Sequence, residues 1–524
     1  MSSIKTFISR NSSVLHKAEF YGFLIALTFF LILSYYNLLM LESYNYTIFD
    51  LGLNYRTMFL FHTNYHLLEW PNPPLITPLT YSKLIYVPLS LTLYINDTAG
   101  TLLLDQIFVI SLGGYSLFRI AGIKTGSTLT PFVVELCYFL YSATYGFMTQ
   151  GGNFVVFFEG FFLLGYFLYL IKKPTISFIA FLFASISNVF APGLIVLFFL
   201  VDFGANRSWS FSLRYFVIKK SFYKVIQRIK DRTIRWKLSL VIAILVLESA
   251  LSLFFIVKYG ISGIFGAARL SMIGTSTVAM HYSIGALLNQ VFKNMGSYKF
   301  NFLNQIFSPV LYVTALTPYA LLVFLFIAVA WYSNQTIYYG SLNTQYSSLF
   351  AAFVFIGFVH FFKGRIKHND TQKIFKRLLV LVLVSSIVSF LIYSPFSLEN
   401  IQSGNVSKYA DVTPFDKDLT HGLSLIPNNA TVYIQNILPQ MMNRKEVYMP
   451  GYYSGQPVDY AVIIPFSFSY LSQYYGGYDN TWAMFFEHNT SYGLYENISG
   501  ALVYKLNYIG PVIYQPSLTA VGQY

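Results

Sequence analysis

The sequence predicts a polytopic α-helical membrane protein of about 11 transmembrane helices (about 10–12), followed by a small α/β domain on the exterior side. Composition is the first observation: the 524 residues are 55% hydrophobic and only 10% charged, with a mean hydropathy of +0.53. Several apolar runs also reach the roughly 20 residues that a membrane-crossing helix needs. The third observation concerns residues 397–524, which contain shorter apolar runs and a larger share of acidic residues than the chain before them.

Clusters of basic residues give the topology. The formal net charge is +13, but residues 397–524 hold nine acidic and only five basic residues. The positive-inside rule assigns the basic clusters to the cytoplasm. They are the N-terminus, Arg119 with Lys124, Lys172 with Lys173, ten residues between Arg207 and Lys237, and six between Lys363 and Arg377. We therefore expect a multi-pass plasma-membrane protein with a cytoplasmic N-terminus and an exterior tail, and no nucleic-acid partner.

The first crossing is expected at 20–41, as a retained anchor and not a cleaved signal peptide, because the run is long and lacks a small-residue cleavage site. The first outer loop, 42–100, follows. Its segment 79–95 is interpreted as an interfacial helix, since a crossing there would put Arg119 and Lys124 outside. The next crossings are expected at 101–120, 129–148 and 153–171.

The stretch 174–202 is long enough for one helix, but one helix would place the basic loop 203–237 on the exterior side. Two short helices that turn near Asn188 and Pro192 keep this loop cytoplasmic, and a proline beside a polar residue suits such a break.

In the second half of the chain, the number of crossings is again chosen so that the basic clusters stay in the cytoplasm. Residues 303–333 contain two prolines and are expected to break near Thr317, which supplies two crossings; a re-entrant piece at 275–292 is the alternative. Further crossings are expected at 237–258, 346–362 and 376–396. The transmembrane domain then covers 1–396 and the exterior domain 397–524.

The exterior domain shows the alternating patterns of a small α/β fold. A short helix is expected at 416–427 and a helical turn at 438–443. Strands are expected at 430–435, 446–449 and 459–464.

Metal and cofactor signals are sparse. The single cysteine, Cys137, lies in an apolar run and excludes disulfides within the chain and thiolate clusters. His62 and His66 have the i, i+4 spacing of a helical metal pair, but no third ligand is evident, so no metal site and no cofactor are assigned and a bound divalent metal is left open.

Acidic residues expected at the outer membrane face are the candidate catalytic groups. Asp50 lies in the first outer loop, and Asp105 and Glu159 lie in the outer third of their crossings. A charge inside a bilayer is costly unless it is paired or faces water, so these three carboxylates are predicted to border one external cavity. Residues expected to join them there are Arg56, His62, His66, Lys83, Gln106 and Asn153.

This set suits sugar transfer from a polyprenyl phosphate, which needs a base for the acceptor and cations or amides for the departing phosphate. Asp50 is the expected base, and Arg56 or Lys83 the expected phosphate contact. Two structural alternatives stay open: Asp105 and Glu159 can serve as polar contacts between helices, and Asp50 can cap the helix that begins near Leu51.

Several motifs together resemble a prokaryotic membrane family described as domain of unknown function 2079. They are Phe49-Asp50-Leu51-Gly52, Thr77-Pro78, Leu104-Asp105-Gln106, the segment of Pro309 and Pro318, and the run from Ile426-Pro427 through Asn443-Arg444 to Asp459-Tyr460. That family resembles the C-type glycosyltransferases (GT-C), which use a catalytic acid in the first outer loop, a Pro-Pro segment and a second acid in a later crossing.

The resemblance implies that Asp50 is the first acid, Pro73-Pro74 the proline segment and Glu159 the second acid. It also implies a GT-C-like fold that transfers sugar from a polyprenyl- or dolichyl-phosphate donor, among membrane lipids, to a surface glycan or protein. The alternatives are a transporter or flippase of an envelope substrate, and a non-catalytic scaffold.

Overall fold

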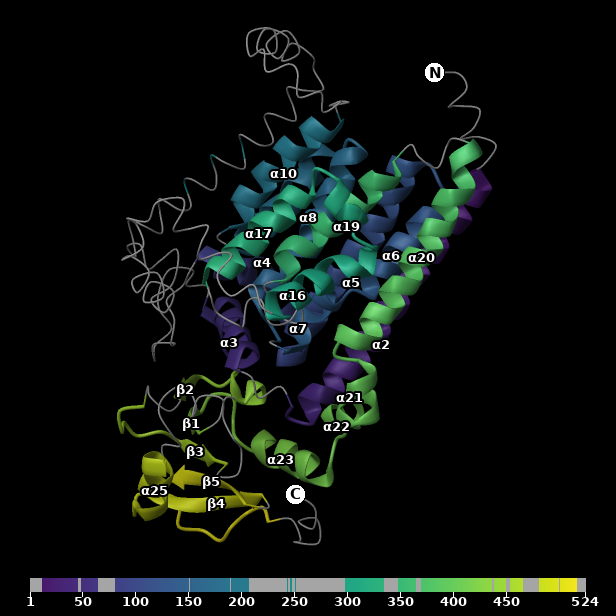
Figure 1. Cartoon of the computed structure of the whole chain (residues 1–524). Coiled ribbons are helices and arrows are strands. Elements are labelled where there is room, and N and C mark those ends of the chain that lie inside the picture. The colour runs from purple at the N-terminus through teal and green to yellow at the C-terminus, as the bar shows by residue number, and fades with distance from the viewer. Residues whose placement is uncertain are drawn as a thin grey trace.

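The computed structural model describes a mostly helical chain with a small sheet near its C-terminus. The described residues are 12–45, 49–64, 81–149, 151–188, 190–206, 243, 246, 250, 297–333, 347–363, 369–435, 438–448, 453–464, 480–498 and 500–515. Figure 1 shows the helices in one bundle, the helical part, with residues 397–515, the tail, at one end. We call this end the tail-side end and the opposite one the far end.

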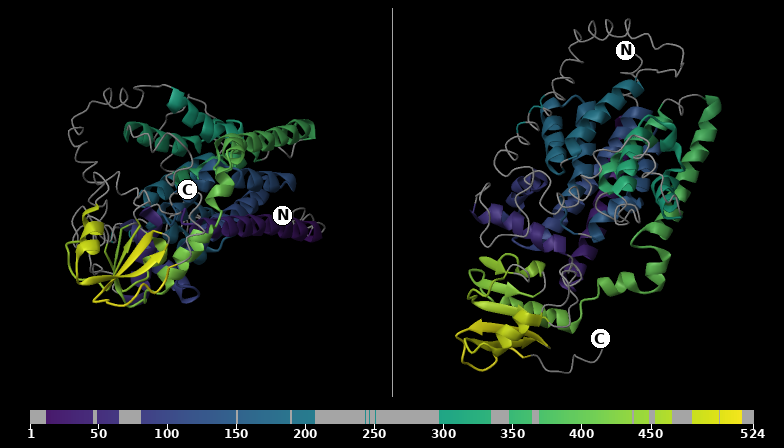
Figure 2. Two further views of the ribbon diagram at one scale, coloured as in Figure 1. Left: turned by 90° about the horizontal axis from the view of Figure 1, so that it is seen from below. Right: turned by 60° about the vertical axis from the view of Figure 1, so that its left-hand side comes forward.

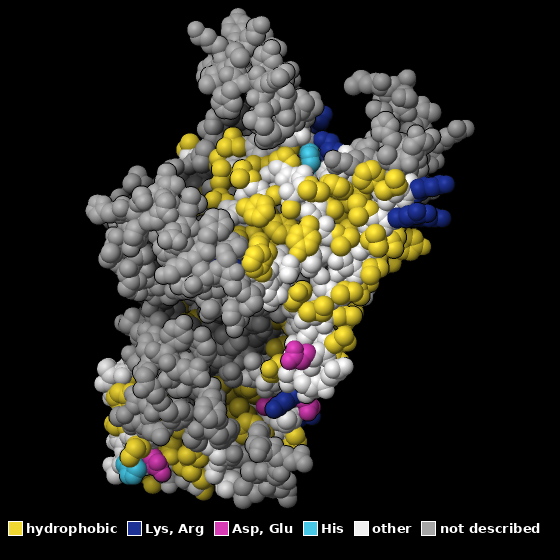
Figure 3. Space-filling view, in the orientation of Figure 1, with side chains coloured by type: hydrophobic (Ala, Val, Ile, Leu, Met, Phe, Trp, Pro, Cys, Tyr) yellow, Lys and Arg dark blue, Asp and Glu magenta, His cyan; other side chains and the backbone are white. Residues whose placement is uncertain are grey.

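Within the described residues, three helices are long and apolar enough to cross a membrane: α2 (Ser12–Glu42), α5 (Ala99–Thr125) and α20 (Asn369–Tyr393). They confirm the helices expected at 20–41, 101–120 and 376–396. Figure 3 shows hydrophobic side chains over the visible face of the helical part, and Lys and Arg gathered towards the far end. The remaining apolar helices are shorter, so a helical membrane protein is confirmed but about 11 full crossings are not.

The single helix expected at 129–148 is wrong, because α6 (Leu129–Phe139) ends early. Hydroxyl groups of the following residues donate hydrogen bonds to the last carbonyl groups of α6: Thr144 Oγ1 donates to Tyr138 O at 2.9 Å and the Tyr145 hydroxyl to Phe139 O at 2.6 Å. These bonds replace the next helical turn, and the chain continues as the short helices η3 (Ser142–Tyr145) and α7 (Gly146–Thr149).

Helix α8 (Phe157–Leu170), preceded by the 3₁₀ turn η4 (Phe154–Val156), occupies the segment expected at 153–171. It packs tightly against α5 because glycines meet at the crossing. A Cβ added to Gly113 would lie 2.9 Å from the Cα of Gly160, so only a residue without a side chain fits there.

The two-helix interpretation of 174–202 is confirmed by α9 (Pro174–Ile186) and α10 (Ala191–Asn206). Asn188 lies in the turn, where its Oδ1 accepts from the Phe190 amide at 2.8 Å. Pro192 lies in the first turn of α10, where its missing N–H leaves no helical bond unmade.

The expected break within 303–333 is also confirmed. Helix α16 (Ser297–Phe307) leads into two 3₁₀ turns, η6 (Ser308–Val310) and η7 (Val313–Leu316), before α17 (Ala320–Ser333). Serines of α20 satisfy freed carbonyls of the break: Ser385 donates to Ser308 O and Ser386 to Pro309 O, both at 2.6 Å. Helix α19 (Ser348–Phe362) follows.

The crossing expected at 237–258 and the alternative re-entrant piece at 275–292 lie outside the described residues, apart from three isolated helical positions in the first of them.

The first loop contains helix α3 (Phe49–Asn64) and a chain of short turns. These are η1 (Tyr81–Ile85), α4 (Tyr86–Leu89) and η2 (Ser90–Tyr94). Their shortness agrees with the prediction that 79–95 does not cross the membrane. Leu91, Tyr94 and Ile95 are exposed, as expected of an interfacial segment.

The tail begins with the short helices α21 (Leu398–Gln402) and α22 (Asn405–Tyr409), which lead from α20 into α23 (Pro414–Ser424). In the right-hand view of Figure 2 this green segment runs down to the sheet. The sheet has the order β2-β1-β3-β5-β4. Its strands are β1 (Thr431–Ile434), β2 (Glu446–Tyr448), β3 (Tyr460–Ile463), β4 (Tyr492–Ile498) and β5 (Ala501–Leu506).

Strands β2, β1 and β3 run parallel, and β5 and β4 add antiparallel. Alternation along β1 separates the two faces of the sheet. Val432 packs in one core cluster with Leu419 of α23, whereas Tyr433 packs in a second cluster with Phe486 of α25 (Asn480–His488). Strands β1 to β3 confirm the three expected strands, and the turn η10 (Pro439–Met441) confirms the expected helical turn.

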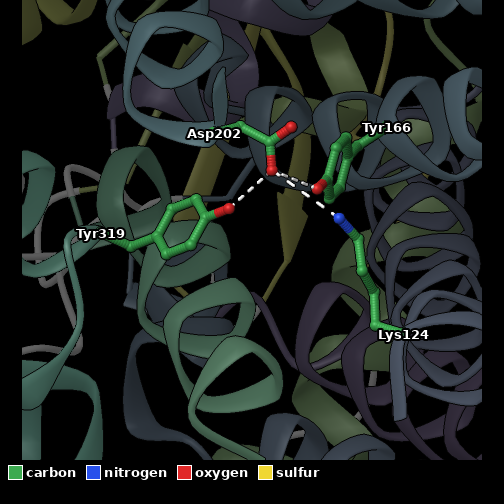
Figure 4. Close-up of polar contacts among 4 residues, drawn as sticks. All are labelled: Lys124, Tyr166, Asp202 and Tyr319. Carbon is green, nitrogen blue, oxygen red and sulfur yellow. Dashed lines mark hydrogen bonds and ion pairs between the residues drawn. The ribbon is translucent and has the colours of Figure 1, made fainter. Parts of the chain in front are cut away.

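A buried polar cluster joins helices towards the far end (Figure 4). One carboxylate oxygen of Asp202, on α10, accepts from the Tyr166 hydroxyl at 2.7 Å and the Tyr319 hydroxyl at 2.6 Å. The ammonium of Lys124, in the last turn of α5, lies 3.8 Å from the same oxygen. Asp202 thereby links α5, α8, α10 and the segment that precedes α17.

Candidate functional site

Asp50 lies at the start of a helix. Its backbone is in the first turn of α3, which begins at Phe49. The amide groups of a first turn carry partial positive charge and favour a carboxylate there. The side chain of Asp50 lies outside the described residues, so its role as base stays a prediction.

Gly152 is the point at which several predicted site segments meet. The Gln106 side chain bonds both sides of this loop: its amide nitrogen donates to Asn153 O at 2.8 Å and its oxygen accepts from the Gly152 amide at 2.9 Å. The hydroxyl of Tyr86, next to the turn that carries Lys83, donates to Gly152 O at 2.6 Å. Gly152 therefore holds together the first loop, α5 and the entry to α8.

The helix of Asp50 reaches the same point. A Cβ added to Gly152 would lie 3.2 Å from the Cα of Leu51, the residue that follows Asp50, and 3.0 Å from Leu102 Cδ2. Gln106 and Asn153, both expected at the external cavity, therefore contact each other, and the backbone of the Asp50 helix lies directly against the Gly152 loop.

Replacing Gly152 by alanine is expected to destabilise this loop by about 1–3 kcal/mol. The φ of Gly152 is +80°, which residues with a Cβ rarely adopt, and the added methyl group would press on Leu51 and Leu102. Thermal unfolding in detergent measures the effect. Gly193→Ala is the matched control, because a Cβ there meets nothing within 4 Å. Equal unfolding temperatures for the two variants would contradict the packing described.

The two intramembrane acids have different surroundings. Asp105 is half-buried, and its Oδ2 accepts from Thr92 Oγ1 of η2 at 2.7 Å. Glu159, in the first turn of α8, is fully buried beside Tyr138, whose hydroxyl is directed to the carbonyl of Ile110. Neither carboxylate oxygen of Glu159 has a hydrogen-bond partner of ordinary geometry among the described residues. That Asp105 and Glu159 border one cavity with Asp50 stays a prediction.

The remaining candidates lie around the first loop. Lys83 is buried in η1, which packs against α9. The ring of His62 packs edge-on against Tyr94 at 4.4 Å, and His66 lies outside the described residues. No group of three or more His, Cys, Asp or Glu side chains in the part of the chain with described coordinates could hold a metal ion.

Arg56 lies at the junction with the tail. Its guanidinium is buried and donates to main-chain carbonyls of the tail: to Met442 O at 2.9 Å, to Arg444 O, and to Lys445 O at 2.8 Å. A phosphate contact by Arg56 would require the guanidinium to leave these partners, so that role stays a prediction.

A second link at the junction was not predicted. The Tyr55 hydroxyl donates to Asp97 Oδ1 at 2.9 Å, and Asn443 of the tail donates to Asp97 O at 3.5 Å. The run of Asn443-Arg444 was a motif in the sequence, but Asp97 offered no signal beyond a position shortly before a helix.

A family model described as "Predicted membrane protein (DUF2079)" matches residues 82–481. The chain belongs to the DUF2079 family. No curated protein is significantly similar to it.

The DUF2079 match confirms the resemblance inferred from the motifs. The matched region contains Lys83, Asp105, Asn153 and Glu159, and it extends past strands β1 to β3 to the start of α25, so that β4 and β5 lie beyond it. It begins after α3, so Asp50 and Arg56 precede it. The family description states a membrane protein, and it names no activity.

Proposed function

We propose that this DUF2079 protein is a GT-C-type membrane glycosyltransferase that moves a sugar from a polyprenyl- or dolichyl-phosphate donor to a surface glycan or protein. The observation that carries the proposal is that three predicted site segments contact the Gly152 loop. There the helix of Asp50, the amide of Gln106 and the turn that follows Lys83 reach one loop at the entry to α8.

Each element has a chemical role in this reaction. Asp50, at a helix N-terminus, is the base that takes the proton of the acceptor hydroxyl. Lys83 supplies positive charge for the phosphate as the sugar leaves it. Asp105 and Glu159 are supporting acids that orient the sugar or acceptor.

The charge distribution supports an exterior reaction. Lys124 lies in the last turn of α5, Lys172 and Lys173 follow the far end of α8, and the acidic tail lies at the opposite end. If the basic end is cytoplasmic, the Gly152 loop and the tail face the exterior of a plasma membrane. This is the side on which lipid-linked sugars are used for surface glycans.

A transporter or flippase is the second candidate, and Glu159 favours it. A buried carboxylate in a membrane helix, without a hydrogen-bond partner of ordinary geometry among the described residues, is typical of a proton or cation path. The enzyme is preferred because the Gly152 loop, with the helix of Asp50 and the side chain of Gln106 against it, lies at one end of the bundle and not at its middle.

The test is donor turnover by purified protein in liposomes, measured as labelled sugar released from a panel of polyprenyl-phosphate sugars. Wild type is expected to turn over a donor, and Asp50→Asn to lose about 10²–10⁴-fold in rate at an unchanged unfolding temperature. Asp411→Asn is the matched control, since Asp411 is an exposed acid of the tail.

Full activity of Asp50→Asn would overturn the assignment of the base. A well-folded wild type that consumes no donor in the panel would count against the transferase, and movement of a labelled lipid-linked sugar across the same liposomes would then favour the flippase.

A further inference from the structure

The contact between α3 and the tail is unusually polar for a buried junction. The side chain of Arg56 is only 3% exposed, yet its fork of N–H groups is directed at carbonyls of Met442, Arg444 and Lys445. Burial lowers the pKa of Arg56 to about 10, which still leaves it charged at neutral pH. A buried cation matched to several carbonyls imposes a defined orientation, because a planar guanidinium bonds well in few geometries.

The neighbouring residue adds a second point of attachment. Tyr55 bonds the side chain of Asp97, and Asn443 of the tail approaches the carbonyl of the same residue. Arg444 is buried as well and donates to Leu423 O at 3.2 Å, which ties this tail segment to α23. The middle of α3 is thus held by a tail segment that is itself fixed to the body of the tail.

Helix α3 also carries Asp50, six residues before Arg56, which is a rise of about 9 Å along the helix. A short helix moves as a rigid unit, so whatever fixes Arg56 fixes the start of the helix as well. The tail segment therefore sets the height and tilt of Asp50 relative to the Gly152 loop.

We propose that Arg56 is a positioning residue, and that the tail, through its carbonyls at 442–445, holds α3 so that Asp50 is presented at the site. This inference rests on the proposed function for its catalytic consequence, but its structural half does not. On this view the tail is a part of the reaction centre and not a separate appendage.

The experiment measures structure and activity on the same full-length protein. Spin labels at Thr63→Cys and Asn429→Cys, both exposed positions, report the distance between α3 and the tail in a Cys137→Ser background. Arg56→Ala is expected to shift and broaden this distance distribution, and Arg56→Lys to do so less. Arg119→Ala is the matched control, because Arg119 pairs with Glu19.

In the sugar-release assay, Arg56→Ala is expected to lower kcat by about tenfold or more with the KM for the donor nearly unchanged, since misplacing a base affects the chemical step. Tyr55→Phe removes only one hydroxyl and keeps the ring, so it is expected to give a smaller change of the same kind.

Two results would overturn the inference. An unchanged distance distribution in folded Arg56→Ala shows that Arg56 does not hold the helix. A raised KM with unchanged kcat shows that Arg56 binds the donor instead. If the distance shifts as expected but wild type turns over no donor, the attachment of α3 to the tail is supported and the transferase function alone fails.

Discussion

Asp202→Ala is expected to lower the free energy of unfolding by about 3 kcal/mol or more. The carboxylate accepts two tyrosine hydroxyls and faces the ammonium of Lys124 inside the helical part (Figure 4). Removing it leaves the partly buried Lys124 cation without this counter-charge and two buried hydroxyl groups without their acceptor. The measurement is thermal or denaturant unfolding in detergent.

Milder variants separate the contributions of the charge and of each hydrogen bond to this loss of stability. Asp202→Asn keeps an acceptor oxygen and loses only the charge, so a smaller effect is expected. Tyr166→Phe and Tyr319→Phe each remove one hydrogen bond and are expected to lose about 1 kcal/mol. Asp411→Ala, at an exposed position of the tail, is the control. An Asp202→Ala protein as stable as this control would contradict a linking role for Asp202.

Glu496→Gln is expected to stabilise the tail above neutral pH and to flatten its pH dependence. Glu496 is buried on β4 against α23, where Gly422 leaves room for it, and neither carboxylate oxygen has a hydrogen-bond partner among the described residues. Burial raises the pKa of Glu496 to about 7 from an ordinary value of 4.5.

The sign follows from proton linkage. Between these two pKa values the unfolded chain releases the proton before the folded chain does, so wild-type stability falls by about 3 kcal/mol as the pH rises and is constant above the folded pKa. Glutamine cannot ionise and does not undergo this loss.

Denaturant unfolding at about pH 5 and about pH 8, followed by hydrogen exchange in the tail strands, measures the difference. Glu496→Gln is expected to be no more stable than wild type at the lower pH and clearly more stable at the higher one. Glu487→Gln changes an exposed glutamate on α25 and is the control. A parallel pH dependence in wild type and Glu496→Gln would refute the assignment.

Several elements could be predicted from the sequence because their signals are local. Length and apolarity identify α2, α5 and α20. The requirement that the basic loop 203–237 stay cytoplasmic, together with Pro192, identifies the turn between α9 and α10. The strands β1 to β3 follow from short β-branched and aromatic runs. Strand β4 was not predicted, since its sequence contains glycine, glutamate and asparagine and it pairs only because β5 lies beside it.

The candidate site was predictable only in part, for a related reason. Gln106 and Asn153 are both candidates by their expected place near the outer membrane face, and in the structure Gln106 bonds the main chain of Asn153. The partners of Arg56 lie 386 to 389 residues away and are main-chain carbonyls, which no side-chain pattern reports. The early end of α6 likewise depends on hydroxyl groups that bond only once the chain has turned.

The sequence by itself determined that the chain is a helical membrane protein with an acidic α/β tail, because hydropathy and charge act on each segment independently of its neighbours. Only the tertiary structure decided that Arg56 binds the tail, that Gly152 joins three segments and that Asp202 links four. Each of these depends on groups brought together from distant parts of the chain, and burial makes their pairing obligatory.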